Sequence, residues 1–508
     1  MERIVKVDTS WHAGGKALSL EEVEGVARGQ IGVQLCSDPE FIGRIQDSVD
    51  YLEYHMGQGP GVYGVTTGVG DSVTRSIPLN QTEDFSHRLL AFHGCGLGKY
   101  FSSEDGRAIT AVRLANLVRG LSGVRPQVLE LLVLLLEKNL VPRIPEEGSV
   151  GASGDLTPLS YLAAVLTGQR TVWWQGQVVD STEALKQAGL LPLTLRPKEA
   201  LAIMNGTAVM TALAARVWVR ARKMANAACL VTALVSRTLE GNPHHFHPAI
   251  FRAKAHNGTV EAGHRIRAAL EPLSSDPHTG RLQDTYALRC APHVLGVLID
   301  TLEWSRPWIE IEINGASDNP LLDPSEPRPL HGGNFYGGHI GLAMEALKNA
   351  VAQVADLLDR QVHLLLDEKS SRGLPANLSG APEALRTVNH GLKALGIAAS
   401  AWAAEALKTS LPSTIFSRST ESHNQDKVSL GTLAARDGVR VMVLSEQVLA
   451  AALVSGSQAA YLRGAPMPKG LQPLVVWIQK ICPPVIEDRA LEDELRGLLA
   501  ALPDYDFS

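Results

Sequence analysis

The segment from residue 148 to residue 160 reads GSVGASGDLTPLS and holds the residue types best suited to unusual backbone chemistry. By composition it is a tight turn that feeds a helix beginning near Leu156, because Asp155 is a suitable N-cap and Pro158 fits the first helical turn. Glycine at position 154 lets the backbone fold back without a Cβ clash. Most Ala-Ser-Gly tripeptides are only such turns, so the rest of the chain has to decide what this one does.

Six further motifs surround this turn. They are YGVTTGVG at 63–70, MNGT at 204–207, QDTYALRC at 283–290, SDNP at 317–320, GGNF at 332–335 and ESHNQD at 421–426. Together, and in this order, they resemble the motifs of the aromatic amino acid ammonia-lyase and histidine ammonia-lyase family, most of all its bacterial tyrosine enzymes. Thr66 and Val69 stand where the family has asparagine and phenylalanine. We expect these differences to change the shape of a lid loop and not the chemistry.

The resemblance implies a prosthetic group made by the chain itself, 4-methylidene-imidazol-5-one (MIO). In the family an Ala-Ser-Gly segment cyclises, which here would involve Ala152, Ser153 and Gly154. The nitrogen of Gly154 would attack the carbonyl of Ala152, and two waters would leave, one of them from the Ser153 side chain. The product is a covalent electrophile, so the resemblance implies neither pyridoxal phosphate nor a metal.

The resemblance also implies a base for the substrate's weakly acidic β-proton. That base would be Tyr63, which joins the catalytic MIO triad and Tyr286. A phenol with an ordinary pKa near ~10 is a poor base at neutral pH. We therefore expect helix N-termini or a nearby cation to lower the pKa of Tyr63.

Further residues are implied to bind the substrate. Arg289 would hold its carboxylate with a planar fork. Asn205 and Gln283 would hydrogen-bond the carboxylate and the prosthetic group, while Tyr286 would sit against the methylidene and the amine. Phe335 would form a wall of the ring pocket.

Two positions bear on which amino acid is used. Phe92-His93 occupies the place of the family's selectivity dipeptide, and it is none of the common pairs, which include Ser-His in histidine enzymes and Phe-Leu in plant-type phenylalanine enzymes. Gln425 stands where histidine enzymes carry a glutamate that pairs with imidazole, which disfavours histidine. His93 offers a polar partner for a phenol, so L-tyrosine, giving trans-4-coumarate and ammonia, is the expected substrate. Glu421 resembles the residue that phenylalanine enzymes place near the substrate amine and keeps phenylalanine open.

Other interpretations remain open within and outside the family. Dopa and histidine are further candidate substrates, and a tyrosine 2,3-aminomutase would use the same site but return the ammonia to the β-carbon. From a different class, the chain could be an inactive helical scaffold, against which the retention of the motif residues argues. The family's homotetramers build each site from three chains. By that resemblance the triad, Tyr63 and His93 would meet Tyr286 and Arg289 of a second chain and Phe335 of a third.

Composition narrows the class of protein. The chain has 508 residues, 45% hydrophobic and 20% charged, which excludes a disordered chain, a coiled-coil rod and a collagen-like fibre. The net charge is −6, and the charged residues form no long run of one sign. We therefore expect neither a nucleic acid nor an anionic membrane as a partner. Five scattered cysteines without Cys-x-x-Cys spacing indicate reduced cytosolic thiols. The N-terminus MERIVKVDTS has no apolar signal core, and charges interrupt the apolar stretches well short of the ~20 residues of a membrane span. We therefore expect a cytoplasmic protein.

One cluster suggests metal binding at first sight, the histidines of NPHHFHP at 242–248. The spacing of His244, His245 and His247 fits zinc poorly, and no cysteine or acidic residue stands within the segment or directly beside it. We expect a solvated loop, or one that supports other site residues, and no metal.

Helical periodicity predicts the elements that must position these residues. Helices are expected over 17–58, with Ser19 and Glu22 as a capping box, and over 81–93, 106–122, 126–140, 341–366, 382–409 and 437–462. A glycine-rich loop over 57–70 and a β-hairpin over 171–180 interrupt them.

The long, alanine-rich helices are apolar around much of their circumference, which suits burial between helices or subunits. The expected architecture is all-α, a long-helix bundle of the ammonia-lyase type with minor β-hairpins and a homotetrameric core. Its domains would be 1–195, with the lid loop and the MIO-forming segment, and 196–508, with the central bundle and C-terminal helices.

Overall fold

The computed structural model describes residues 10–58, 61–272 and 282–507, so Gly59 and Pro60 of the lid loop and most of the N-terminal segment lie outside the described residues. The chain divides into two compact units. Unit 1 comprises Met1–Arg216, Arg306–Met344 and Pro412–Arg436, and unit 2 comprises Val217–Ser305, Glu345–Leu411 and Asp437–Ser508. The domain boundary at residue 195 stays a prediction.

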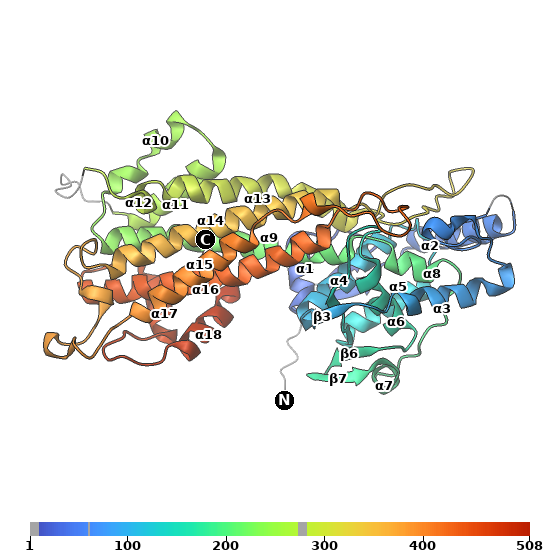
Figure 1. Ribbon diagram of the computed structural model, residues 1–508, viewed down its shortest axis with the longest axis horizontal. Helices are drawn as coiled ribbons and strands as arrows, with labels where there is room; N and C mark the ends of the chain where they lie inside the picture. Colours follow the sequence, from blue (N-terminus) through green and yellow to red (C-terminus); the bar gives the residue numbers. More distant parts are fainter. Residues whose placement is uncertain (1–9, 59–60, 273–281, 508) are drawn as a thin grey trace. The chain divides into compact units, whose positions relative to one another are not determined.

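Unit 1 holds a set of shorter helices and the strands (Figure 1). Its helices are α1 (Leu20–Ala27), α2 (Pro39–Met56), α3 (Thr82–Phe92), α4 (Ser103–Leu117), α5 (Pro126–Glu137), α6 (Leu156–Leu166), α7 (Ser181–Gln187) and α8 (Glu199–Met204). Its strands are β1 (Ser10–Ala13), β2 (Gly32–Leu35), β3 (Leu97–Tyr100), β4 (Val141–Pro142), β5 (Pro145–Glu147), β6 (Thr171–Trp174) and β7 (Gln177–Asp180).

The strands form small sheets at the margins of the helices. β6 and β7 make the predicted hairpin, with Thr171 opposite Asp180 and a turn at Gln175 and Gly176, both with positive φ. β4 pairs antiparallel with β6, and β3 pairs antiparallel with β5. The helix predicted over 17–58 is wrong in its middle, because β2 separates α1 from α2 and pairs in parallel with β1. The capping box of Ser19 and Glu22 is present.

Four long helices belong to unit 1 at one end and to unit 2 at the other. They are α9 (Ala208–Thr238), α13 (Ala291–Asn314), α14 (Gly338–Leu366) and α16 (Gly431–Arg463). Within unit 2 they run alongside one another (Figure 1): the Trp218 indole on α9 donates to the Leu302 carbonyl on α13, and the Gln361 amide on α14 donates to the Thr232 hydroxyl on α9. The all-α class with minor strands is confirmed.

Unit 2 is completed by shorter helices, which are α10 (Pro248–Ala253), α11 (Asn257–Leu270), α12 (Tyr286–Arg289), α15 (Lys393–Thr409), α17 (Gln472–Ile481) and α18 (Glu492–Ala501). The helix predicted over 382–409 starts late, since α15 begins only at Lys393. Before it, the N–H groups of His390 and Gly391 donate to the Asp488 carboxylate, which holds this stretch out of the helix.

One described helix is longer and more apolar than the sequence analysis expected. By length and composition α16 could cross a membrane, but 72% of its apolar window is buried inside the structure. That burial is typical of a core helix.

Asp155 precedes helix α6 in unit 1, and its carboxylate binds the N-termini of two other helices, α9 and α16. Asp155 directly precedes α6, as predicted, but its side chain makes no capping bond there. Instead one carboxylate oxygen accepts from the N–H groups of Val209 and Met210, both at 3.0 Å, in the first turn of α9. The other accepts from the hydroxyl of Thr432 in the first turn of α16. The side chain is fully buried, and this burial raises the pKa of Asp155 to about 6.

Two buried cations hold the loops beside this junction. The Arg113 guanidinium donates to the carbonyls of Asn205 and Ser317, each at 3.0 Å. The Lys198 ammonium lies 2.7 Å from the Asp318 carboxylate, and both side chains are fully buried. Because buried cations need such partners, these contacts bind the 205–207 and 317–320 motifs to one framework.

We predict that Asp155→Ala lowers the free energy of unfolding by ~2–5 kcal/mol, since it leaves two buried backbone donors without an acceptor. The measurement is the urea midpoint at fixed protein concentration. The control is Asp180→Ala, because Asp180 also accepts from a helix N-terminal N–H, that of Thr182, but is exposed. Its loss should cost only ~0.5–2 kcal/mol. Equal losses in the two variants would contradict the role of Asp155.

Candidate active site

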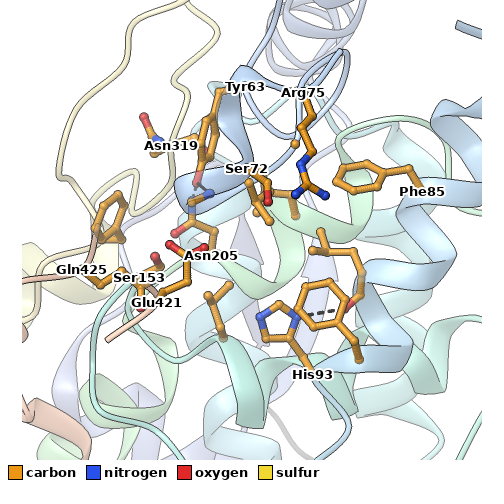
Figure 2. A pocket seen from close by; sticks show the side chains of 18 of the residues that line it. Tyr63, Ser72, Arg75, Phe85, His93, Ser153, Asn205, Asn319, Glu421 and Gln425 are labelled. Atoms are coloured by element: carbon orange, nitrogen blue, oxygen red, sulfur yellow. Dashed lines mark hydrogen bonds between the residues drawn. The ribbon is translucent and has the colours of Figure 1, made fainter. Parts of the chain in front are cut away.

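Unit 1 contains a cavity of about 380 Å³, a size typical of small-molecule sites (Figure 2). The loop after α2, helix α3, the turn before α6 and the chain segments at 319–335 and 421–425 all contribute to it. It brings together most of the residues that the sequence predicted for the site, namely Tyr63, Phe92, His93, Ser153, Asn205, Phe335, Glu421 and Gln425.

The Ala152–Gly154 segment is fixed on both sides of Ser153. Gly154 has φ +66°, and a Cβ there would lie 2.2 Å from the Gly206 carbonyl oxygen, so only glycine fits. The next N–H, that of Asp155, donates to the same carbonyl at 2.7 Å. On the other side the Ser429 hydroxyl donates to the Gly151 carbonyl at 3.1 Å. The turn is therefore folded back as the sequence predicted, with the Ser153 side chain facing the cavity (Figure 2).

Asn205 offers an unused polar atom beside Ser153. Its side-chain amide donates to the Asn319 carbonyl at 2.9 Å, whereas its Oδ1 is buried and has no hydrogen-bond partner among the described residues. Buried polar atoms are nearly always paired in folded proteins. Asn205 Oδ1 can only accept, so it is left for a donor on a bound ligand. The residues around Ser153 fit an MIO group because the turn is folded back and only glycine fits at position 154.

Tyr63 lies in the glycine-rich loop, and its hydroxyl accepts from the Gly70 N–H at 2.8 Å. Gly70 begins the short 3₁₀ helix Gly70–Thr74, so a helix N-terminus does reach the phenol, as expected. Burial nevertheless raises the pKa of Tyr63, and the Glu421 carboxylate raises it further. The sequence analysis expected this pKa to be lowered, but the groups of a single chain raise it.

Glu421 also lines the cavity and binds the same loop. Both of its carboxylate oxygens accept from the Asp71 N–H, at 3.0 and 2.8 Å. A Cβ at Gly70, where φ is +59°, would lie 2.3 Å from a Glu421 oxygen, so glycine is required for this approach. Nearby, the Gln425 side-chain oxygen accepts from the Thr420 hydroxyl at 2.8 Å.

His93 directly follows α3 and is both bonded to the backbone and part of the cavity wall. Its Nδ1 lies 2.9 Å from the Leu89 carbonyl oxygen, which can only accept, so Nδ1 carries the proton. Burial, and secondarily the Arg170 cation, lower the pKa of His93. The ring is therefore neutral, and its Nε2 is left as a hydrogen-bond acceptor.

Several lining residues escaped the sequence analysis. Phe85 and Leu89 precede Phe92 on one face of α3 at helical spacing, which could have revealed them. Leu201 lies on α8, one helical turn before Asn205, which directly follows that helix. Arg75 had no such signal, although its side chain points into the cavity (Figure 2).

Gln283, Tyr286 and Arg289 belong to unit 2 and do not line this cavity. The Arg289 guanidinium lies over the Tyr286 ring, 4.5 Å from its centroid, and its Nε donates to the Asp284 carbonyl at 3.0 Å. Tyr286 is 71% exposed. Phe335 lines the cavity of its own chain, and its contribution to a site of another chain stays a prediction.

The histidines of the 242–248 segment serve the loop itself. The His247 Nδ1 accepts from the Ala249 N–H, and His244 donates its N–H to the Asn242 side chain. His245 has an acidic neighbour that the sequence spacing did not reveal, since Asp284 lies 3.6 Å away. Among the described residues no group of three His, Cys, Asp or Glu side chains is arranged to hold a metal ion.

Comparison with known proteins identifies the family of the chain. The family model of aromatic amino acid lyases matches residues 18–479. The chain belongs to the aromatic amino acid lyase family. It is similar to the histidine ammonia-lyases of Treponema denticola, with 33% identity over 96% of this chain and 95% of that one, and of Gloeobacter violaceus, with 34% identity over 98% and 97%.

Solved structures agree with this membership. The tyrosine aminomutase from Streptomyces globisporus matches with a TM-score of 0.91 and 31% identity, covering 98% of this chain and 97% of that one. As an aromatic amino acid lyase, the protein is a carbon–nitrogen lyase that acts on a small-molecule amino acid. Enzymes of this family are generally MIO-dependent.

We predict that Glu421→Gln shifts the ascending limb of the pH profile of kcat/KM to lower pH by ~0.5 unit or more. The reason is that removing a negative charge favours the phenolate, so the pKa of Tyr63 falls, while the glutamine oxygen can still accept from Asp71. Asp426→Asn, an exposed position in the same loop, is the matched control and should leave the limb in place. A limb that stays or moves upward in Glu421→Gln would refute this electrostatic coupling.

Proposed function

We propose that the protein eliminates ammonia from L-tyrosine to give trans-4-coumarate, with an MIO group formed autocatalytically from Ala152, Ser153 and Gly154. The observation that carries the choice of tyrosine is the neutral His93 in the cavity wall. Its Nδ1 proton is committed to Leu89, and its Nε2 can accept a hydrogen bond from a phenol. Phenylalanine would leave that acceptor unpaired, which costs ~1–3 kcal/mol for a buried group.

Histidine is disfavoured by the absence of an acid at position 425. Gln425 lies where histidine enzymes carry a glutamate, and its side-chain oxygen already accepts from Thr420. A glutamine cannot form an ion pair with imidazole. The histidine ammonia-lyase names of relatives at 33–34% identity therefore support the family and the chemistry rather than the substrate.

Within this proposal each group of the chain has one task. When present, the MIO group supplies a strong electrophile beside the substrate. Tyr63 removes the β-proton, and its hydroxyl is oriented for that by the Gly70 N–H. Arg289 holds the substrate carboxylate with its two terminal nitrogens, and the Asn205 side-chain amide donates to the prosthetic group.

We propose that Arg289, Tyr286 and Gln283 reach the cavity from another chain of a cytoplasmic homotetramer whose sites are shared between subunits. Two observations support this. First, the three residues lie in unit 2, and Tyr286 is 71% exposed. Second, among the described residues only the Gly70 N–H lowers the pKa of Tyr63. An arginine arriving beside Tyr63 would favour the phenolate.

A tyrosine 2,3-aminomutase is the second candidate. It is favoured by the similarity to the Streptomyces globisporus tyrosine aminomutase, whose fold matches over nearly the whole chain. The same residues would act, and the ammonia would return to the β-carbon.

The test is a panel of tyrosine, dopa, phenylalanine and histidine with analysis of the products. The proposal expects tyrosine to have the highest kcat/KM and 4-coumarate with free ammonia as the product. Accumulation of β-tyrosine would establish the aminomutase instead. A mass of the intact chain that is not two waters below that of the sequence would overturn the MIO assignment.

We predict that His93→Leu moves the ratio of kcat/KM for tyrosine over phenylalanine towards phenylalanine by at least ~1–3 kcal/mol. Leucine removes the acceptor for the phenol and offers an apolar surface to the phenyl ring. The two rates are measured on soluble variant protein of unchanged oligomeric state.

His87→Leu is the matched control, because His87 lies on the same helix but does not line the cavity. It should leave the ratio unchanged. If His93→Leu lowered both activities equally, His93 would be a structural histidine, and the main reason for naming tyrosine would be lost.

A further inference from the structure

A buried carboxylate anchors the motif that carries Arg289. Asp284 is 7% exposed and lies in unit 2, two residues before Tyr286. One of its oxygens accepts from the Asn242 N–H at 2.6 Å, and the other accepts from the Arg372 guanidinium at 2.9 Å. Arg372 also donates to the Glu240 carbonyl, so its planar group spans the two segments and is held at both ends.

His245 completes the grip on the backbone of the same residue. The Asp284 N–H donates to His245 Nε2 at 3.0 Å, which requires the ring to be neutral with its proton on Nδ1. The same ring nitrogen is also 3.6 Å from the Asp284 carboxylate, so it lies beside both the backbone N–H and the side chain of Asp284. Asp284 is thus held through its side chain and its N–H by three residues outside its own motif.

The third polar group of Asp284 orients Arg289. The Asp284 carbonyl accepts from Arg289 Nε at 3.0 Å, and the guanidinium lies over the Tyr286 ring. With Nε engaged, the plane of the guanidinium is fixed. No acceptor among the described residues bonds to its two terminal nitrogens, so they remain a fork of the geometry that a carboxylate takes.

We propose that His245 and Arg372 are positioning residues which, through Asp284, set the orientation of the Arg289 fork that binds the substrate carboxylate. This inference rests on the proposed role of Arg289. Neither residue touches the substrate. A displacement of the Asp284 carbonyl moves the Arg289 guanidinium directly, and errors of about 1 Å in such a group can cost up to ~10²-fold in rate.

Inhibition by two ligands that differ only in the carboxylate separates positioning from general damage. These are the deaminated product of the best substrate, 4-coumarate for tyrosine, and its decarboxylated analogue, 4-vinylphenol. In Arg372→Gln we expect the inhibition constant of the carboxylate ligand to weaken by about tenfold or more, while that of the analogue changes less than about twofold. Arg372→Lys, which keeps a charge but not the fork, should fall between wild type and Arg372→Gln.

Arg220→Gln is the matched control. Arg220 also lies in unit 2, is bonded to Glu446 at 2.9 and 2.6 Å, and has a side chain 24% exposed against 25% for Arg372. It makes no contact with Asp284 and should leave the preference for the carboxylate ligand unchanged. A loss in Arg220→Gln equal to that in Arg372→Gln would overturn the proposal.

His245 gives a second, independent pair of variants. His245→Phe removes the acceptor for the Asp284 N–H, whereas His245→Gln retains an amide oxygen that can accept from it. We expect the phenylalanine variant to lose the carboxylate preference and the glutamine variant to recover much of it. Equal behaviour of the two would overturn the role of this hydrogen bond.

Arg289→Gln distinguishes a failure of this inference from a failure of the proposed function. If Arg289→Gln keeps the wild-type preference for the carboxylate ligand, then Arg289 does not bind the carboxylate, and the proposed role fails. If Arg289→Gln loses the preference while Arg372→Gln and His245→Phe keep it, only the positioning inference is overturned.

Discussion

The structure of the site depends on a single buried carboxylate, that of Asp155. This carboxylate accepts hydrogen bonds from the first turns of α9 and α16, while the backbone N–H of Asp155 donates to the Gly206 carbonyl. Asp155 directly follows the Ala-Ser-Gly turn, so the turn is connected to the starts of both helices. The burial that raises its pKa to about 6 is the cost of this arrangement. Two helix N-termini at one carboxylate compensate the charge and place their positive ends beside the turn. Gly154 can then keep a backbone conformation that no other residue would fit.

The predicted site residues of the two units differ in their electrostatic environment. In unit 1, burial and the Glu421 carboxylate both oppose ionisation of Tyr63, and the Gly70 N–H alone among the groups that shift its pKa favours it. In unit 2, the Arg289 guanidinium donates to the Asp284 carbonyl and lies beside the exposed Tyr286. No cation is among the groups that shift the pKa of Tyr63, and Arg289 does not line the cavity. An assembly that brings Arg289 to the cavity supplies that cation, and this is the physical reason for proposing shared sites.

The sequence predicted the local features well and the non-local ones unevenly. The turn at 152–154, the hairpin at 171–180 and the long helices α14 and α16 follow from glycine positions and periodicity, and all are present. The β1–β2 pair was missed because four-residue strands beside strong helical patterns leave little signal. The delayed start of α15 depends on Asp488, almost a hundred residues away, and the role of His245 depends on Asp284, which no spacing rule connects to it. The motifs also could not say from which chain Phe335 comes.

The measurement that tests the account most directly is complementation between two inactive subunits. Ser153→Ala chains lack the hydroxyl needed for the prosthetic group, and Arg289→Gln chains lack the carboxylate fork. Each is purified alone, and then the two are co-expressed with different tags so that mixed tetramers can be isolated. If sites are shared, an equal mixture should regain about a quarter of the wild-type activity, because some sites combine an intact triad from one chain with Arg289 from another. Mixed tetramers that remain as inactive as their parents would contradict the account.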